Sequence, residues 1–367
     1  MKVLHITCWF PNKKNAGRAI FIKKQIDALS QFADSTILHF EIVKSHSFKK
    51  EKIVQGNLEQ TILYTPIYIW PLIEILHFFW LYLTLVIRKR HAQFDVINFH
   101  IAYPMLVYWK YIKKKINKPV LISEHWSAYK NNFGINKELP QIKNIFCQNL
   151  PLAAVSETLI KDIRSFSKCQ FKSFVIPNTV DSELFYPSKL NAKSNNKFLM
   201  CSFWKSPKRP FLVLKAFKKH IESNREIHLT IIGSGPLTKS IEKWVIENQV
   251  QNNITLLGAK NSTEIGKIMR SNDVFLHPSD YETFSVVCAE ALACGLPVIA
   301  SNVGAIPEVV SENGLLVENN EESWYNAIKV YLEGKFRVSA TRSNPYDKKT
   351  IGKLYFDTLK SVINETD

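Results

Sequence analysis

The sequence of 367 residues lacks the patterns that usually mark metal or redox chemistry. Its six cysteines form no CxxC pair and no zinc spacing, so we expect reduced, mostly buried thiols in a cytosolic protein. The histidines show no ligand spacing, and we expect no metal. The turn GSGP at Gly233–Pro236 lacks the third glycine of a dinucleotide fingerprint, which argues against an NAD site.

Signals for secretion, repeats and low complexity are also missing. The N-terminal run MKVLHITCWF is only as long as a strand and ends at Pro11 and a basic loop, so we do not interpret it as a signal peptide. Apolar residues make up 46% of the chain, which is long enough for two domains with large cores.

Acidic residues are scarce in one half only. Residues 1–180 contain 25 Lys and Arg against 11 Asp and Glu, whereas the remainder contains 23 against 21. The net charge of +16 therefore lies almost entirely in the first half. Such a half is expected to face an anionic partner, for which nucleic acid and an anionic membrane are the usual candidates.

Apolar runs of strand length alternate with amphipathic stretches along the whole chain. This pattern predicts parallel sheets with crossover helices. The pattern restarts after the polar segment at 191–197, so we predict two Rossmann-like domains with a boundary near 178–197. The predicted helices include one at 103–116 and a final one at 346–364.

Residues 75–91, ILHFFWLYLTLVIRKRH, fit a soluble domain poorly. A membrane span needs about 20 residues, and extension back to Ile67 includes Pro71 and Glu74. A span, a buried helix and an interfacial helix therefore all remain open for residues 67–91. The stretch VYWKYIKKKINK at 107–118 places aromatic residues beside lysines, which favours a membrane surface over the alternative of a solvated basic face.

The most informative stretch is SDYETFSVVCAEALACGLPV, Ser279–Val298. A helix starting near Thr283 or Ser285 would present free amides and a positive dipole end to a diphosphate. Glu290 follows Ser285 by five residues, about 7–8 Å along the axis, and Glu282 stands on the other side of this anion site. This order suits a nucleotide-sugar, with Glu290 accepting hydrogen bonds from ribose hydroxyls and Glu282 facing the sugar. Alternatively, Glu290 caps a loop amide or pairs with a lysine.

The stretch PSDYETFSVVCAEALACGLPVIASNVGAIPEVV at 278–310 resembles the EX7E signature of the retaining nucleotide-sugar glycosyltransferases of family 4. Further matches occur in order, among them HITCWFPN, SEHWSAY, VIPNTVDSELF and LTIIGSGPL. The resemblance covers most of the chain, weakly at 45–90. It implies the GT-B fold, in which two Rossmann-like domains face each other across a cleft. Residues 1–180 with helix 346–364 would be the acceptor and membrane side, and residues 181–345 would bind the donor.

The resemblance also implies roles for individual residues, all in binding or transfer of a UDP- or GDP-sugar without cofactor or metal. Glu282 would contact the donor sugar and help organise the reacting centre, and His125 would lie near the same sugar. Glu290 would bind the ribose and Lys208 a phosphate. The backbone of Thr283, Phe284 and Ser285, and the glycine loop at Gly17, would approach the diphosphate.

Some positions depart from the family pattern. The family usually has an arginine where this chain has Phe203, and glycines where it has Thr283 and Ser285. Lys205 or Arg209 could supply the missing charge, although lysine does not grip a phosphate bidentately as arginine does. These departures affect how the donor diphosphate would be bound, and they leave the expected class of protein unchanged.

The resemblance predicts an enzyme that extends a glycan or lipid-linked acceptor in bacterial capsule or lipopolysaccharide-type biosynthesis. We expect it on the cytoplasmic face of an anionic membrane and without nucleic acid. A soluble sugar synthase or phosphorylase of the same fold is the alternative, and a catalytically dead basic protein that binds membrane or nucleic acid is a remote one. The sequence identifies neither the sugar, the base, the acceptor nor the oligomeric state.

Overall fold

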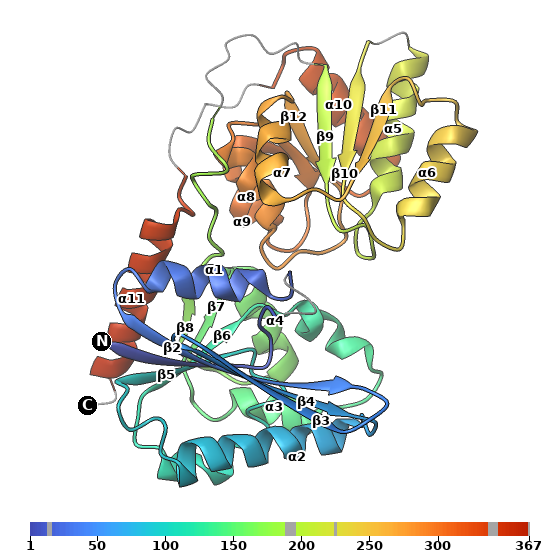
Figure 1. Ribbon diagram of the computed structural model, residues 1–367. Coiled ribbons are helices and arrows are strands. Elements are labelled where there is room, and N and C mark those ends of the chain that lie inside the picture. Colours follow the sequence, from blue (N-terminus) through green and yellow to red (C-terminus); the bar gives the residue numbers. More distant parts are fainter. Residues whose placement is uncertain (13–16, 188–195, 224–225, 337–343, 366–367) are drawn as a thin grey trace. The chain divides into compact units, whose positions relative to one another are not determined.

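A computed structural model describes residues 1–12, 17–187, 196–223, 226–336 and 344–365. The chain divides into an N-terminal unit, Met1–Thr179 with Lys348–Asp367, and a C-terminal unit, Val180–Asp347. Each unit is built on its own largely parallel sheet with helices packed against it (Figure 1). The expected pair of Rossmann-like α/β sheets is confirmed.

The N-terminal sheet has the strand order β3-β4-β2-β1-β5-β6-β7-β8, and only β3 is antiparallel to its neighbour. Its strands are β1 (Lys2–Thr7), β2 (Asp34–Lys44), β3 (Lys49–Gln55), β4 (Leu58–Thr65), β5 (Val96–His100), β6 (Val120–Glu124), β7 (Leu152–Ala154) and β8 (Ser173–Val175). Its α-helices are α1 (Ile20–Leu29), α2 (Trp70–Leu81), α3 (Pro140–Phe146), α4 (Glu157–Ser167) and α11 (Lys348–Asn364). Central strands such as β5 and β6 are buried along their whole length, as expected for parallel strands covered on both faces.

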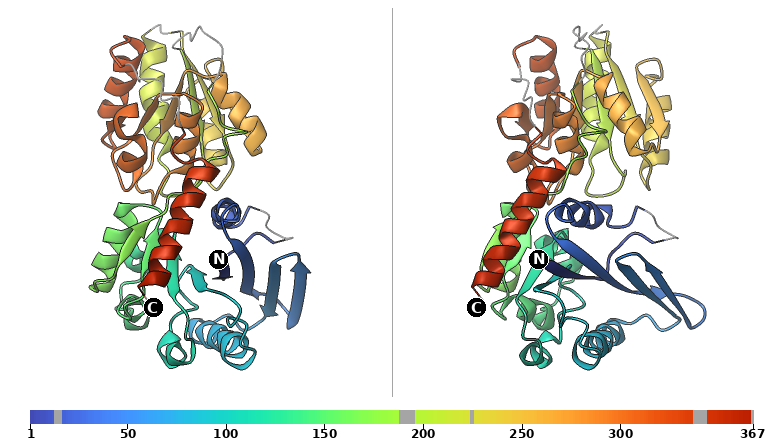
Figure 2. Two further views of the ribbon diagram at one scale, coloured as in Figure 1. Left: turned by 90° about the vertical axis from the view of Figure 1, so that its left-hand side faces the viewer. Right: turned by 60° about the vertical axis from the view of Figure 1, so that its left-hand side comes forward.

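The final helix α11 returns to the N-terminal unit and packs against α1, as predicted (Figure 2). The contact is so close that a Cβ atom at Gly352 would lie 2.2 Å from the carbonyl oxygen of Ala28. The buried Tyr355 hydroxyl meets the side chain of Asn98 on β5. The last residues of the chain thus complete the core of the first unit.

The C-terminal sheet is wholly parallel, in the order β11-β10-β9-β12-β13-β14. Its strands are β9 (Lys197–Cys201), β10 (His228–Ile232), β11 (Ile254–Gly258), β12 (Val274–His277), β13 (Val298–Ser301) and β14 (Gly314–Val317). Its α-helices are α5 (Pro210–Glu222), α6 (Thr238–Glu247), α7 (Ser262–Arg270), α8 (Val286–Ala293), α9 (Ile306–Val310) and α10 (Glu321–Leu332). Most of the polar segment expected as a linker, 191–195, lies outside the described residues.

Two expectations for the N-terminal unit are wrong. The stretch 103–116 is not an α-helix but a series of turns with short 3-10 helices at Trp109–Tyr111 and Lys113–Lys115. Its apolar side chains Met105, Trp109 and Ile112 are buried. They are three or four residues apart, and both an α-helix and a series of turns can bury side chains at that spacing. The cysteines are not all reduced either, because Cys147 after α3 and Cys169 after α4 form a disulfide. The two helices end close together, with the Cα atoms of this pair 5.3 Å apart.

Residues 70–87 form one continuous helical stretch, in which α2 is followed by a π-helix, η1 (Tyr82–Ile87). Within the described part of the chain, this is the one stretch long and apolar enough to cross a membrane by length and composition, and 33% of it is buried. Figures 1 and 2 show it on an outer face of the N-terminal unit, with the sheet on one side.

Candidate active site

Three side chains of the C-terminal unit meet where β12 ends and α8 begins. Glu282 forms an ion pair with Lys208 and accepts a hydrogen bond from His277, whose Nε2 lies 2.9 Å from Glu282 Oε1. The side chains of Lys208, His277 and Glu282 are 15%, 2% and 18% exposed. The cluster lies at the carboxyl end of a parallel strand, where open α/β sheets bind their ligands.

The charges of this cluster are set by burial and by its neighbours. Burial alone would raise the pKa of Glu282, but Lys208 and His277 outweigh it and hold that pKa at about 2. The pKa of His277 is lowered, first by burial and then by the Lys208 charge. At neutral pH, Glu282 is therefore an anion that accepts hydrogen bonds and cannot donate a proton.

Backbone contacts between two loops place Lys208 beside Glu282. Arg209 N donates to Pro278 O at 3.2 Å, and Asp280 N donates to Pro207 O at 2.8 Å. These bonds make a single antiparallel bridge between Lys208 and Ser279. The paired backbone therefore fixes where the Lys208 side chain starts, and the ion pair with Glu282 holds its ammonium group.

A glycine fixes the backbone of Glu282 from the other side. Ala305 N donates to Glu282 O at 2.9 Å, and Gly304 has the positive φ of +55° that L-residues rarely adopt. A Cβ atom at Gly304 would lie 2.4 Å from Glu282 O. The loop after β13 can therefore approach Glu282 only because residue 304 has no side chain.

The start of α8 presents backbone to the site. Ser285 precedes the helix in the left-handed region, with φ 74° and ψ 73°. Its carbonyl accepts hydrogen bonds from Cys288 N and Ala289 N. The amides that come before this first bond, those of Val286 and Val287, have no helical carbonyl four residues earlier in the chain. Phe284 is buried and packs edge-on against Tyr346, with ring centroids 5.1 Å apart, so only its backbone is available to a ligand.

Glu290 lies within α8 and is 7% exposed. Its charge contributes, after burial, to raising the pKa of Cys201 at the end of β9 to about 12. The carboxylate therefore lies near the carboxyl end of the central strands, on the same helix whose start adjoins Glu282. Glu290 thus lies on the helix that begins at Val286, four residues after Glu282.

The three cations of the loop 203–209 differ in their contacts. Only Lys208 contacts Glu282, because Arg209 pairs with Asp280 at 3.2 Å, with both side chains half-exposed. Lys205 lies over the ring of Phe203, 5.6 Å from its centroid, and that ring is 57% exposed. A cavity of about 400 Å³ beside Lys208 is lined by Arg209, Asp280 and the first turns of α5.

His125 and Gly17, the other predicted site residues, belong to the N-terminal unit. His125 follows β6, packs against Phe21 at 4.8 Å between centroids, and faces His100 at 6.2 Å. Burial lowers the pKa of His125 to about 3, so its imidazole is neutral. Glu124 supports this segment by accepting hydrogen bonds from the His125 amide and the Tyr129 hydroxyl, at 3.2 and 2.7 Å.

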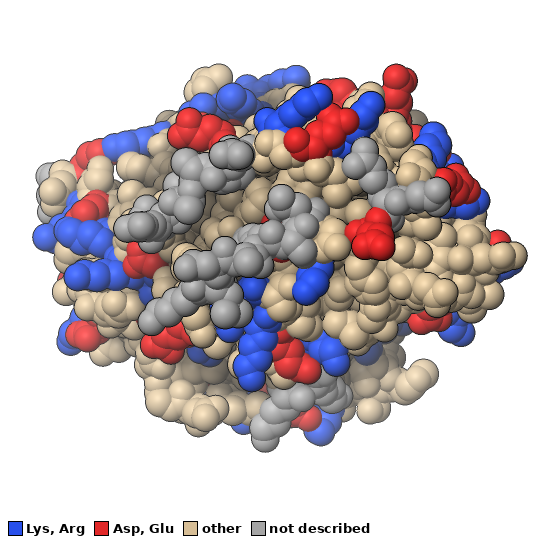
Figure 3. Space-filling model, turned by 90° about the horizontal axis from the view of Figure 1, so that it is seen from above, with Lys and Arg blue, Asp and Glu red and all other residues tan. Residues whose placement is uncertain are grey.

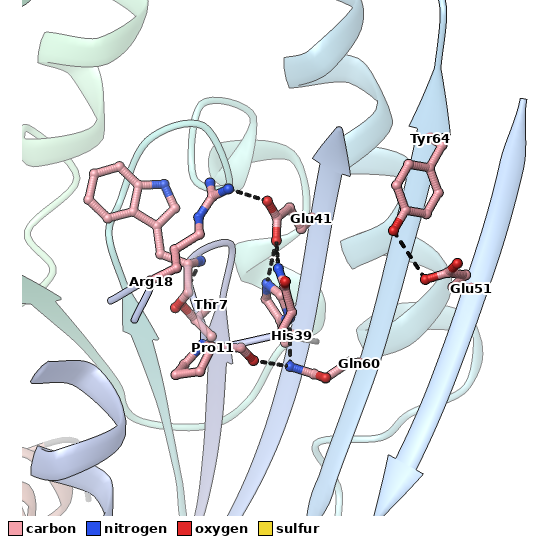
Figure 4. A network of polar contacts seen from close by, with 10 residues as sticks. Thr7, Pro11, Arg18, His39, Glu41, Glu51, Gln60 and Tyr64 are labelled. Atoms are coloured by element: carbon pink, nitrogen blue, oxygen red, sulfur yellow. Dashed lines mark hydrogen bonds and ion pairs between the residues drawn. The ribbon is translucent and has the colours of Figure 1, made fainter. Parts of the chain in front are cut away.

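A buried acid supports the region of Gly17. Glu41 on β2 pairs with Arg18 and accepts a hydrogen bond from Asn12 at 3.1 Å (Figure 4). His39 lies 3.5 Å from the same carboxylate, and Gln60 on β4 donates to Pro11 O at 2.7 Å. Glu41 therefore ties both flanks of the glycine loop to the sheet. Gly17 itself is exposed.

Sequence reasoning missed His277 and Glu41 as parts of these clusters. The signal for His277 was its position as the last residue of a strand, five residues before Glu282. No local pattern indicated Glu41, because its partners are distant in sequence. Among the described residues, no group of three or more His, Cys, Asp or Glu side chains could hold a metal ion.

The sequence comparisons find glycosyltransferases. Residues 182–349 match the family described as "Glycosyl transferases group 1". An uncharacterized glycosyltransferase of Methanocaldococcus jannaschii is 28% identical over 235 residues, which is 62% of each chain. The alpha-monoglucosyldiacylglycerol synthase of Acholeplasma laidlawii is 23% identical over 308 residues, 74% of this chain and 77% of that protein.

Solved structures share the whole fold. The lipopolysaccharide outer core galactosyltransferase WaaB superposes with a TM-score of 0.73 at 15% identity, covering 98% of this chain and 99% of that one. The Anabaena protein HepE in complex with UDP and glucose superposes with a TM-score of 0.69 at 17% identity, covering 98% and 100%.

Two α/β units, each built on a largely parallel sheet, give the chain the GT-B fold. The C-terminal unit carries the match to the group 1 glycosyl transferases, since residues 182–349 lie almost wholly within it.

Proposed function

We propose that this protein transfers a sugar from a UDP- or GDP-sugar, with retention of anomeric configuration, to a glycan or lipid-linked acceptor in cell-surface polysaccharide biosynthesis. The observation that carries the proposal is the ionised Glu282, held by Lys208 and His277 directly before the amide-presenting start of α8. Glu290 supplies a second carboxylate from the same helix.

Charge development in the reaction suits these groups. When the bond between the sugar and the nucleoside diphosphate breaks, negative charge accumulates on the leaving phosphate. Lys208 and the first-turn amides of α8 would stabilise that charge, and preorganised donors of this kind typically contribute several kcal/mol. Glu282 would accept hydrogen bonds from the donor sugar, and Glu290 would accept them from the ribose.

The donor is proposed as a UDP- or GDP-sugar. HepE, which shares the fold, has been solved with UDP and glucose. In this chain Phe203 replaces a cation, and neither Lys205 nor Arg209 joins Lys208 at Glu282. We therefore expect Lys208 and the α8 amides to provide most of the contact with the diphosphate.

The acceptor is proposed as a lipid-linked glycan of the capsule or lipopolysaccharide type. The names of the Acholeplasma glucosyldiacylglycerol synthase and of the lipopolysaccharide galactosyltransferase support a lipid-bearing acceptor. The excess of 25 basic over 11 acidic residues in positions 1–180 supports an anionic one. No nucleic acid enters this proposal.

Thermal unfolding with UDP, GDP, ADP, CMP and their common sugar conjugates tests the donor site. A ligand at a hundredfold excess over Kd stabilises the folded state by about 2.7 kcal/mol. We expect one nucleotide to give such a shift, and Glu290→Ala to lose it. Glu242→Ala, on the exposed face of α6, is the matched control and should keep the shift.

A shift for one nucleotide would also name its base. The anomeric configuration of the product, followed by NMR on a sugar acceptor, would then test retention. Absence of any shift at millimolar nucleotide, or an equal shift in Glu290→Ala, would contradict the proposed donor site.

A further inference from the structure

The helical stretch 70–87 carries an apolar stripe on its outer surface. Ile75, Phe79, Leu83 and Ile87 follow one another at four-residue intervals and are 38%, 61%, 42% and 60% exposed. Four-residue spacing places side chains on one face of a helix. Soluble proteins rarely leave a contiguous apolar surface of this kind uncovered.

The inner face of the same stretch carries its polar side chains. Glu74, His77 and Thr84 are only 5%, 3% and 6% exposed. Glu74 accepts a hydrogen bond from the Tyr103 hydroxyl at 3.0 Å, and the His77 ring packs against Phe40 at 5.0 Å between centroids. A water-facing helix shows the reverse pattern, with polar residues outside. The outer face is therefore suited to an apolar medium.

Aromatic and basic side chains border this stripe. The turns at 108–115 pack beside it, since the Phe78 and Tyr108 rings are 5.6 Å apart and Lys115 Nζ lies 3.4 Å from the Tyr82 hydroxyl. The exposed cations in this border are Arg88, Lys89, Lys110, Lys113, Lys114 and Lys115, and the exposed aromatics include Trp70 and Tyr111. Aromatic rings and Lys or Arg beside an apolar face match the headgroup region of a bilayer.

We propose that the outer face of residues 67–87, bordered by the 108–115 turns, docks on an anionic bilayer with the helix lying along the membrane surface. This deepens the proposed function, because it names the surface at which a lipid-linked acceptor would be met. The helix lies on the bilayer rather than spanning it, because its inner side packs on β2, where Phe40 stacks on Trp80 at 4.8 Å.

The charges favour a bilayer over a second copy of this chain. A two-fold contact through the same face would use the same patch on both subunits, and it would bring two basic borders together. Like charges placed close together oppose association. Anionic headgroups instead complement Lys113 and Lys114 while the acyl region receives Phe79 and Ile87.

Sedimentation with vesicles tests the proposal on the full chain without any donor. Vesicles of equal parts phosphatidylglycerol and phosphatidylcholine are compared with vesicles of phosphatidylcholine alone. We expect binding to the mixed vesicles, weakened about tenfold by each of Phe79→Ser and Ile87→Ser, because each deletes an apolar side chain from the contact. Ile246→Ser on α6, at 62% exposure, is the matched control and should bind as the wild type does.

The basic border has a separate variant. Lys113→Gln with Lys114→Gln should weaken binding to the mixed vesicles by about fivefold per lysine and leave any binding to phosphatidylcholine unchanged. Wild-type protein that remains in the supernatant with both vesicle types overturns the proposal. Equal binding by wild type and Phe79→Ser/Ile87→Ser, or a wild-type dimer that this variant dissociates without vesicle binding, also overturns it.

Nucleotide-dependent thermal shifts on the same proteins separate this inference from the proposed function. We expect Phe79→Ser/Ile87→Ser to keep the wild-type shift, which also shows that the variant is folded. Vesicle binding without any nucleotide shift would refute the sugar-transfer proposal and leave membrane docking standing.

Discussion

Glu282 combines burial with full ionisation, and this combination depends on one cation and one imidazole. Removal of Lys208 would leave a largely buried carboxylate with His277 as its remaining partner in the cluster. An uncompensated buried charge is costly and raises the pKa of an acid. In the intact cluster, Lys208 and His277 more than offset the cost of burying the Glu282 carboxylate.

The pKa of Glu282 predicts a pH-dependent contribution to stability. The pKa of Glu282 is about 2 in the folded protein and about 4.5 in the unfolded chain. The ionised carboxylate therefore stabilises the folded state above pH 4.5, and this stabilisation is lost as the pH falls toward 2. We expect Glu282→Gln to be less stable than wild type by about 2 kcal/mol at neutral pH, with the difference shrinking in acid. Urea unfolding of the C-terminal unit at several pH values measures it.

A suitable control for that series is Glu242→Gln, an exposed acid on α6. A Glu282→Gln difference that stays constant from neutral to acidic pH would show that Lys208 does not hold the carboxylate in solution.

Sequence patterns identified some residues of the site but not all of them. Glu282, Glu290 and Lys208 lie in motifs, and Lys208 and Glu282 indeed meet. His277 joins them through the end of a strand, and Glu41 joins Asn12 to Arg18 through tertiary contacts. Contacts between distant segments leave no local pattern, so one sequence cannot predict them.

At the scale of elements, the start of α8 has an unusual backbone. Ser285 adopts φ 74°, a conformation that costs an L-residue about 1–2 kcal/mol and costs glycine almost nothing. The family pattern has a glycine here, and this chain retains the geometry without it. The site thus keeps a strained residue directly before the helix.

We expect Ser285→Gly to stabilise the C-terminal unit by about 1 kcal/mol, because it removes the left-handed strain. Urea unfolding at neutral pH gives the change in free energy. Ser285→Ala serves as the comparison, because it deletes the hydroxyl but keeps the strain. A gain of the same size in both variants would mean that the hydroxyl, not the backbone, sets the effect.

The element predictions succeeded where the pattern was long and periodic. The parallel strands and the helices of the C-terminal unit follow directly from alternating apolar runs. The hairpin of β3 and β4 was missed because β3, KKEKIVQ, is mostly charged and lies at the sheet edge. The 103–116 segment was misassigned because 3-10 turns and an α-helix bury apolar residues at similar spacings.

At the scale of the whole molecule, the charge is divided between the units. On the face seen in Figure 3, basic and acidic side chains lie intermingled. The C-terminal unit, residues 180–347, carries 19 basic and 18 acidic residues, whereas residues 1–179 with 348–367 carry 29 and 14. Long-range attraction to an anionic surface would therefore act mainly on the N-terminal unit, and it would weaken with ionic strength.

The return of α11 predicts that a change near the C-terminus will destabilise the N-terminal unit. Gly352→Ala would place a Cβ atom 2.2 Å from Ala28 O and should cost about 2 kcal/mol through overpacking. Hydrogen exchange read separately for each unit should show faster opening in the N-terminal unit and no change in the C-terminal one. Lys360→Ala, on the exposed side of α11, should leave both units unchanged. Faster hydrogen exchange in the C-terminal unit instead would contradict the placement of α11 in the N-terminal unit.

The same helix has a consequence for how the protein is made. Residues 1–179 leave the ribosome first, yet their unit needs Gly352 and Tyr355 to cover α1 and β5. The C-terminal unit, Val180–Asp347, is complete before α11 is translated. We therefore expect the N-terminal unit to complete its core only after α11 has been translated, and so later than the C-terminal unit.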